Sequence, residues 1–270
     1  MSVAYVIFPM YRREFDGLVL YTFESLGAYP ELVHAITTRH GGVSTGPYSS
    51  LNVSNRLGDD PEAVEENLRR VCAALGLQRR DVTSPNQRHT ANVRRVGMTE
   101  RGHVQEGYDA LVTDQECIPL LLRYADCVPV LIYDPAHRAV ALVHSGWRGT
   151  VLGAPRAAVE SLVREFGSRP EEMVAAIGPS IGPCCYEVGR DVVHAVQGAF
   201  SGSDMLLPSH PGGRRHLDLW TANWRWLSGC GVQQIELSQI CTACHTEDFY
   251  SHRAENGKTG HFAAVMSLRE

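Results

Sequence analysis

Residues 125–150 read ADCVPVLIYDPAHRAVALVHSGWRGT and contain two apolar segments on either side of a short turn. Their length and their Val, Ile and Leu content predict two buried strands that form a hairpin. A tight turn over residues 134–137 places Cys127 directly opposite His144 if the register is regular. The Cβ atoms of this pair would then lie about 4.5–5.5 Å apart, close enough to share a metal ion or a proton.

This register depends on Pro129, because a proline cannot donate a ladder hydrogen bond and often marks an edge or a bulge. A bulge would place Cys127 and His144 on opposite faces, whereas a regular hairpin also pairs Leu131 with Val140 and Pro129 with Leu142. The spacing alone leaves three alternatives open: metal ligands, a catalytic pair, and buried core residues.

Residues 145–150, SGWRGT, predict a glycine-flanked turn from a strand into a helix. A helix N-terminus attracts anions through its unpaired N–H groups. Arg148 adds a bidentate donor for phosphate. The alternative is that Arg148 pairs with a carboxylate such as Asp126.

The composition indicates an ordinary soluble globular protein of 270 residues with a net charge of −5. The absence of any block of like charges argues against a nucleic-acid surface or a basic membrane-binding patch. No stretch approaches the roughly 20 apolar residues that span a bilayer, and the opening MSVAYVIFPMYRREFDG carries charges where a signal peptide would stay apolar. We therefore expect a cytoplasmic protein, one domain over residues 1–270, with a monomer favoured and its cysteines present as thiols.

The chain alternates helical and strand patterns without repeats. Helices are predicted at residues 59–75, 150–166, 190–200 and 217–229, and strands around 173–182, 235–242 and 261–268. Glycine-rich or polar loops are predicted at 37–54 and 201–216. Interspersed helices, hairpins and strands that are apolar on both faces predict an α/β fold of mixed β-sheets covered by helices.

Several motifs in this order resemble a known family. They are TTRHGGVSTGPYSSLNVS (37–54), NQRHTANV (86–93), DALVTDQECIPLLLRYADCVPVLIYD (109–134), VHSGWRGT (143–150), AIGPSIGPCCYEVG (176–189) and FYSHRAENGKTGHFAAV (249–265). The chain resembles the YfiH-like family, called laccase-domain or polyphenol oxidase proteins and now regarded as purine nucleoside phosphorylases. The resemblance implies a layered α/β/β/α fold similar to the catalytic domain of cytotoxic necrotising factor.

The resemblance also implies a zinc site. In that family the ligands are the histidine of Q-x-H, the cysteine of A-D-C and the histidine of H-x-G-W-R-G, which match His89, Cys127 and His144. Two nitrogens and one thiolate with a vacant fourth position suit a catalytic zinc, with copper as the less favoured metal. The chain departs from the family pattern at Arg88, Ser145, Ser180 and residues 251–253, none of which is a ligand.

The implied activity is phosphorolysis of adenosine, inosine, guanosine and methylthioadenosine to the base and ribose 1-phosphate, with hydrolytic deamination of adenosine. His89, Cys127 and His144 would be the catalytic residues. We expect Asp126 to support a ligating histidine. Candidate contacts to substrate or phosphate are Arg39, Arg148 and Arg253, with Asn52 and Gln87 as residues that orient the base or brace a loop.

Three other functions compete with this one. A multicopper polyphenol oxidase needs many converging imidazoles, and none of the twelve histidines is spaced as His-x-His. A Cys/His hydrolase with Cys127 as nucleophile and His144 as base needs a free thiolate. A non-catalytic zinc-binding partner protein is the third.

Four further cysteines match weaker patterns. Cys241-x-x-Cys244-His245 matches a haem-attachment motif and half of a zinc knuckle. Without an export signal and without a second cysteine pair nearby, we expect a packing or surface role. The adjacent Cys184 and Cys185 are expected to be free thiols in a loop.

Overall fold

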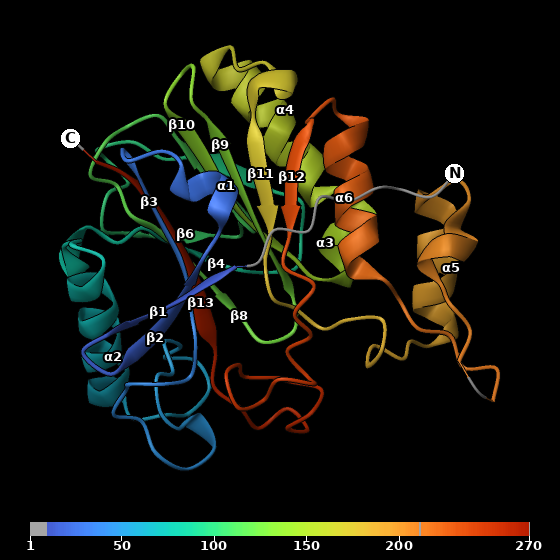
Figure 1. Ribbon diagram of the computed structural model, residues 1–270, viewed down its shortest axis with the longest axis horizontal. Coiled ribbons are helices and arrows are strands. Elements are labelled where there is room, and N and C mark those ends of the chain that lie inside the picture. Colours follow the sequence, from blue (N-terminus) through green and yellow to red (C-terminus); the bar gives the residue numbers. More distant parts are fainter. Residues whose placement is uncertain (1–9, 211, 270) are drawn as a thin grey trace.

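The computed structural model describes residues 10–210 and 212–269, which form three β-sheets (Figure 1). The opening residues 1–9, on which part of the signal-peptide argument rests, lie outside this range. The first sheet has five antiparallel strands, in the order β1 (Tyr11–Phe15), β2 (Leu18–Thr22), β3 (Leu32–Thr37), β13 (Phe262–Leu268) and β8 (Leu120–Tyr124).

The second sheet has six strands and is mixed. Its order is β12 (Gln234–Leu237), β11 (Val174–Ile177), β9 (Val128–Asp134), β10 (Ala139–Ser145), β7 (Ala110–Thr113) and β5 (Val93–Arg95). The β11–β12 and β5–β7 pairs are parallel, and the other pairs are antiparallel. The third sheet is the parallel pair β4 (Ser84–Asn86) and β6 (Val104–Glu106).

The two large sheets pack on each other through one apolar cluster. From the first sheet it contains Leu122 and Met266, and from the second Leu131, Val140 and Leu142, all of them fully buried. Because side chains alternate along a strand, the opposite faces of the same strands are left for helices to cover.

Helices form the outer layers (Figure 1). The outer face of the five-stranded sheet packs on α2 (Pro61–Ala74). The outer face of the six-stranded sheet packs on α3 (Trp147–Leu152), α4 (Ala154–Phe166), α5 (Arg190–Ala199) and α6 (Leu219–Gly229). The short α1 (Glu24–Gly27) and 3₁₀ turns at Gly46–Tyr48, Arg79–Asp81, Pro170–Glu172 and Ser203–Leu206 complete the elements. The predicted α/β fold, mixed sheets layered between helices, is confirmed.

Most predicted helices and strands are present near the expected residues, with one revision. The helix predicted at 150–166 is two helices, because Gly153 adopts φ +78° and interrupts the helical path. The helix predicted at 59–75 is α2, and it is capped by Asp60, whose side chain accepts a hydrogen bond from the Glu62 N–H. Over the described part of the chain, no helix is both long and apolar enough to cross a membrane.

The β9–β10 hairpin is confirmed, but its predicted register is wrong by two residues. His144 lies opposite Pro129 rather than Cys127, because the connection is longer than a tight turn and spans residues 135–138. Asp134 caps this loop by accepting hydrogen bonds from backbone N–H groups within it, and Arg138 adopts φ +48°. A shift of two residues preserves the side of the sheet, so Cys127 and His144 still face the same way.

Candidate active site

Three side chains converge from separate segments at one end of the β9–β10 hairpin. His89 lies in the loop after β4, Cys127 immediately precedes β9, and His144 lies near the end of β10. Their ligand atoms, the imidazole nitrogens and the Cys127 Sγ, lie within 4.8 Å of one another. The structure therefore brings together the three residues that the sequence predicted as metal ligands.

The backbone around this cluster is adapted to the close approach. His89 has φ +59° and Asp126, just before Cys127, has φ +83°, both in the left-handed region that L-residues rarely adopt. At Gly146 a Cβ atom would lie 2.7 Å from the Cys127 Sγ and 3.0 Å from the His89 Nδ1. Only glycine leaves room at this position for all three side chains to meet.

Asp109, which has no exposed surface, ties two of the three residues together. Its Oδ1 accepts hydrogen bonds from the His89 N–H at 2.9 Å and the His144 Nδ1 at 2.8 Å. Its Oδ2 accepts from the N–H groups of Arg88 and Thr90 and from the Thr90 hydroxyl. Because the His144 Nδ1 is held by this carboxylate, the His144 Nε2 is the nitrogen free to act in the site.

The surroundings of Cys127 and His144 shift the pKa values of the thiol and the imidazole in opposite directions. Burial raises the pKa of Cys127, but the charge of His144 and hydrogen bonds from both histidines outweigh it and bring this pKa down to about 6. Burial lowers the pKa of His144, but the Cys127 charge and the Asp109 hydrogen bond raise it to about 9. The cluster therefore favours a thiolate beside a protonated imidazole when no metal is bound.

The donor set fits a transition metal. A thiolate and two imidazoles are ligands that zinc and copper both accept, and three protein ligands leave one coordination position for substrate or water. The hydrogen bond from His144 to a buried carboxylate is the support that ligating histidines commonly have.

The cluster opens into a cavity of about 450 Å³, within the size range of ligand pockets. The described residues that line it include four arginines, Arg56, Arg123, Arg148 and Arg253, and a single carboxylate, that of Asp126. Two aromatic side chains, Trp147 and Tyr186, also line it. The cavity is therefore strongly cationic in a chain whose net charge is −5.

The family model described as "Multi-copper polyphenol oxidoreductase laccase" matches residues 33–269. The chain belongs to this family of enzymes. It is 37% identical over 258 residues to a purine nucleoside phosphorylase of Bacteroides thetaiotaomicron, which covers 92% of the chain and 96% of the relative. It is 35% identical over 234 residues to adenosine deaminase RL5 from an unknown prokaryote, with 83% and 89% covered.

A solved structure gives the same family. YlmD from Geobacillus stearothermophilus has a TM-score of 0.90 and 34% sequence identity, and the match covers 96% of this chain and 98% of that one. The laccase-domain family thus includes relatives named for purine nucleoside chemistry, although the description of the family model refers to copper.

The structure places three of the five predicted substrate contacts in the cavity of this laccase-domain enzyme. Gln87, Arg148 and Arg253 line it. Gln87 also exchanges two hydrogen bonds with the Arg123 backbone, and the Arg253 guanidinium donates to the carbonyl of Glu187. Arg148 stacks on Trp147 at 4.3 Å and forms no ion pair with any described carboxylate, Asp126 included.

The other two predicted contacts, Arg39 and Asn52, do not line the cavity. Arg39 donates to the carbonyls of Ser49 and Thr246 and pairs with Glu255. Asn52 is fully buried and forms hydrogen bonds with Ser54, Asp59 and His261. It therefore braces its loop, which is the second of the two roles predicted for it.

Asp126 does not support a ligating histidine, so this prediction is wrong. Its side chain instead accepts hydrogen bonds from the Thr242 and Ser251 hydroxyls and from the Arg253 N–H. The supporting carboxylate is Asp109, which the sequence analysis assigned no role. The available signal was an acidic residue directly before the apolar segment that forms β7.

Among the residues that sequence reasoning missed, four carry basic side chains that line the cavity: Arg56, Arg123, His252 and His261. The available signal for Arg123 was a cation inside an apolar segment. Burial lowers the pKa of Arg123 to about 10. Burial lowers the pKa of His261 to about 3, and its Nδ1 is buried without a hydrogen-bond partner among the described residues. His261 is therefore a neutral imidazole beside the cluster.

Proposed function

We propose that this protein is a zinc-dependent purine nucleoside phosphorylase with adenosine deaminase activity as a side reaction. The substrates would be adenosine, inosine, guanosine or methylthioadenosine together with phosphate, and the products the free base and a ribose 1-phosphate. Three observations support it: the names of the relatives, the three-residue metal-binding cluster and the cationic cavity. We further propose that the single domain acts as a monomer in the cytoplasm.

The arginines of the cavity carry the phosphorylase proposal over its alternatives. Four guanidinium groups with one carboxylate create a site for an anion, and guanidinium binds phosphate through paired hydrogen bonds. The one carboxylate, Asp126, is already engaged by three donors. The side chains of Arg123 and Arg253 already donate to the backbone carbonyls of Val53 and Glu187. The guanidinium groups of Arg56 and Arg148 have no hydrogen-bond or ion-pair partner among the described residues, so we assign the phosphate to these two.

Phosphorolysis requires that the cavity hold the phosphate beside the anomeric carbon and stabilise its charge. The glycosidic C–N bond breaks with its electron pair going to the purine, which takes up a proton, and a phosphate oxygen forms the new bond to the anomeric carbon. The arginines would hold phosphate against that carbon, which removes the entropic cost of bringing the reactants together. Their charges would also stabilise the anion as it approaches the developing cation.

The base needs apolar and polar contacts. Trp147 and Tyr186 supply aromatic surface for a purine. His261 lines the cavity and, kept neutral by burial, offers an uncharged imidazole to the substrate. We propose that these three residues form the nucleoside end of the cavity.

His89, Cys127 and His144 would hold the metal. A zinc ion there supplies Lewis-acid chemistry and, for deamination, the means of activating water. Asp109 holds the imidazole of His144 and the backbone of His89 in place through the hydrogen bonds described above. Zinc is favoured over a copper relay because the ligand cluster contains only two imidazoles, those of His89 and His144, among the described residues.

An inosine assay tests the proposal. Purified protein should release hypoxanthine only when phosphate is present, with ribose 1-phosphate in equal amount. Arg148→Gln should raise the KM for phosphate about tenfold or more, because a charge-assisted contact contributes about 1.5–3 kcal/mol, while the KM for inosine changes little. Release without phosphate would point to the Cys/His hydrolase, and oxidation of phenols with several equivalents of bound copper would point to the laccase.

A further inference from the structure

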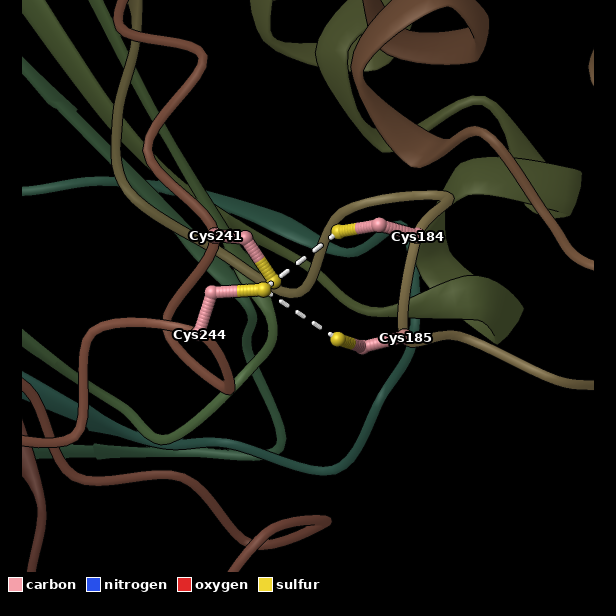
Figure 2. Close-up of side chains that lie close together, drawn as sticks. All are labelled: Cys184, Cys185, Cys241 and Cys244. Atoms are coloured by element: carbon pink, nitrogen blue, oxygen red, sulfur yellow. Dashed lines mark hydrogen bonds between the residues drawn. The ribbon is translucent and has the colours of Figure 1, made fainter.

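Four cysteines that are far apart in sequence converge in space outside the cavity. Figure 2 shows the sulfur atoms of Cys241 and Cys244 facing those of Cys184 and Cys185. The Cys244 Sγ lies 3.3 Å from the Cys185 Sγ and 3.6 Å from the Cys184 Sγ, and all four sulfurs lie within 4.8 Å of one another. The expectation that no second cysteine pair lies near the C-x-x-C segment is therefore wrong.

The topology explains the convergence. β11 and β12 are parallel neighbours, so the segments that follow them leave the sheet at the same edge. The two segments stay paired beyond the strands, where Ser180 and Cys241 form a parallel bridge with hydrogen bonds at 3.1 Å on each side. Two loops held in this way deliver one cysteine pair each to the same place.

Both loops have backbones arranged around the sulfurs. The Gly182 N–H donates to the Cys241 Sγ at 3.2 Å, and the N–H groups of Cys244 and His245 both donate to the Cys241 carbonyl, which closes a tight turn. A Cβ at Gly182 would lie 2.7 Å from the Trp220 ring and 3.2 Å from the Cys184 Sγ. This position therefore requires glycine, as does the position of Gly146 at the active-site cluster.

The sulfur separations match a tetrahedral metal site. Four thiolates at the zinc–sulfur distance of about 2.3 Å lie about 3.8 Å from one another. The two shortest contacts here, 3.3 and 3.6 Å, are slightly below that value, and all the separations are within 4.8 Å. A disulfide would use only two of the cysteines and would need its sulfurs about 2.05 Å apart, and all four are free. The N–H donor to Cys241 also favours a charged sulfur at that position.

We propose that Cys184, Cys185, Cys241 and Cys244 bind a structural zinc ion. Four protein ligands leave no open position, so this ion would take no part in chemistry. It would lock the two loops together, and the loops border the active site. Ile181 and Tyr186, on either side of the Cys184–Cys185 pair, line the cavity. Thr242, between Cys241 and Cys244, donates a hydrogen bond to Asp126, next to Cys127.

Metal analysis of the purified chain tests this site independently of the proposed activity. Protein prepared with reductant should contain one zinc equivalent more than Cys244→Ser prepared in the same way. Cys230→Ser is the matched control, because Cys230 is a partly buried thiol outside the cluster and should keep the wild-type content. The double variant Cys127→Ser/His144→Ala removes two of the three active-site ligands and none of the four cysteines, so its remaining zinc reports the four-cysteine site whether or not the proposed function is correct.

X-ray absorption on zinc-bound Cys127→Ser/His144→Ala, purified without added metal, gives the ligand set directly, and it remains informative if Cys244→Ser fails to fold. Sulfur scatterers alone, at about 2.3 Å, are expected. Nitrogen or oxygen ligands, absence of bound zinc, or a Cys185–Cys244 disulfide found by mass spectrometry in the reduced preparation would overturn the proposal. Wild-type zinc content in a folded Cys244→Ser variant would overturn it as well.

Discussion

The two clusters of sulfur and nitrogen ligands differ in what surrounds them. The active-site cluster, His89, Cys127 and His144, has three ligands, opens into a cationic cavity and is held by a buried carboxylate. The four-cysteine cluster has four ligands, lies in two surface loops and has a backbone donor, the Gly182 N–H, to one of its sulfurs. Ligand number and surroundings, rather than ligand type, thus separate a site for chemistry from a site for stability.

Replacing one ligand in each cluster should give the largest effects we expect. The active-site variant should lose activity, and the four-cysteine variant should lose thermal stability. Cys127→Ala removes Lewis-acid stabilisation worth several kcal/mol, so kcat/KM for inosine phosphorolysis should fall by about 10³-fold or more with little change in Tm. Cys244→Ser should lower Tm by several degrees, because metal binding there is coupled to folding, and should retain most of the kcat. Equal losses of activity and unchanged Tm in both variants would contradict the distinction.

Asp109→Asn should weaken metal binding at the active-site cluster alone, with a smaller effect than the loss of a ligand. The amide cannot hold the His144 Nδ1–H and the surrounding N–H groups as the carboxylate does, and loss of such a partner commonly costs about 10–100-fold in metal affinity or activity. Zinc affinity at the active-site cluster should fall by that factor, while the four-cysteine site keeps its zinc. Thr90→Val is the control, since it removes one donor to Asp109 and leaves the His144 contact intact. Unchanged zinc affinity in Asp109→Asn would remove Asp109 from the mechanism.

Much of the fold and the convergence of Cys127 with His144 could be predicted from the pattern of apolar residues, whereas His89 followed only from the family resemblance. The periodic spacing of apolar residues marks most helices and strands, and a register error of two residues leaves Cys127 and His144 on the same side of the hairpin. The loop length that set the true register depends on the Asp134 cap and on φ +48° at Arg138, which the pattern of apolar residues does not encode.

Contacts between distant segments were harder to predict. Asp109 meets His89 and His144 only after β7 and β10 have paired, and the four cysteines meet only because β11 and β12 are parallel neighbours. Each cysteine pair alone was a weak motif, and the two pairs lie more than 50 residues apart in the chain. Strand order, rather than local spacing, created both arrangements.

The dependence of the unfolding free energy on pH in the acid range should depend on His261, which lines the active-site cavity. His261 has a pKa of about 3 in the folded chain against an ordinary value of 6.5, so the unfolded chain binds more protons between these values. The free energy of unfolding should therefore fall as pH drops below about 6.5, by about 1–2 kcal/mol at pH 5 from this residue. In urea titrations across that range, His261→Gln should flatten the slope and the exposed-site control His103→Gln should not. If the unfolding free energies of wild type and His261→Gln fall in parallel with pH, His261 is not a buried neutral imidazole.

Thr242 links the two regions, and its replacement should give the smallest effect. Thr242 and Ser251 each donate a hydroxyl hydrogen bond of 2.7 Å to the same oxygen of Asp126, but only Thr242 lies between two cysteines of the four-cysteine cluster. Thr242→Val and Ser251→Ala should each cost about 1–3 kcal/mol of unfolding free energy, seen as a Tm lower by a few degrees. Only Thr242→Val should also speed the release of zinc from the four-cysteine site to a chelator. If both variants release it at one rate, the Asp126 contact does not couple the two clusters.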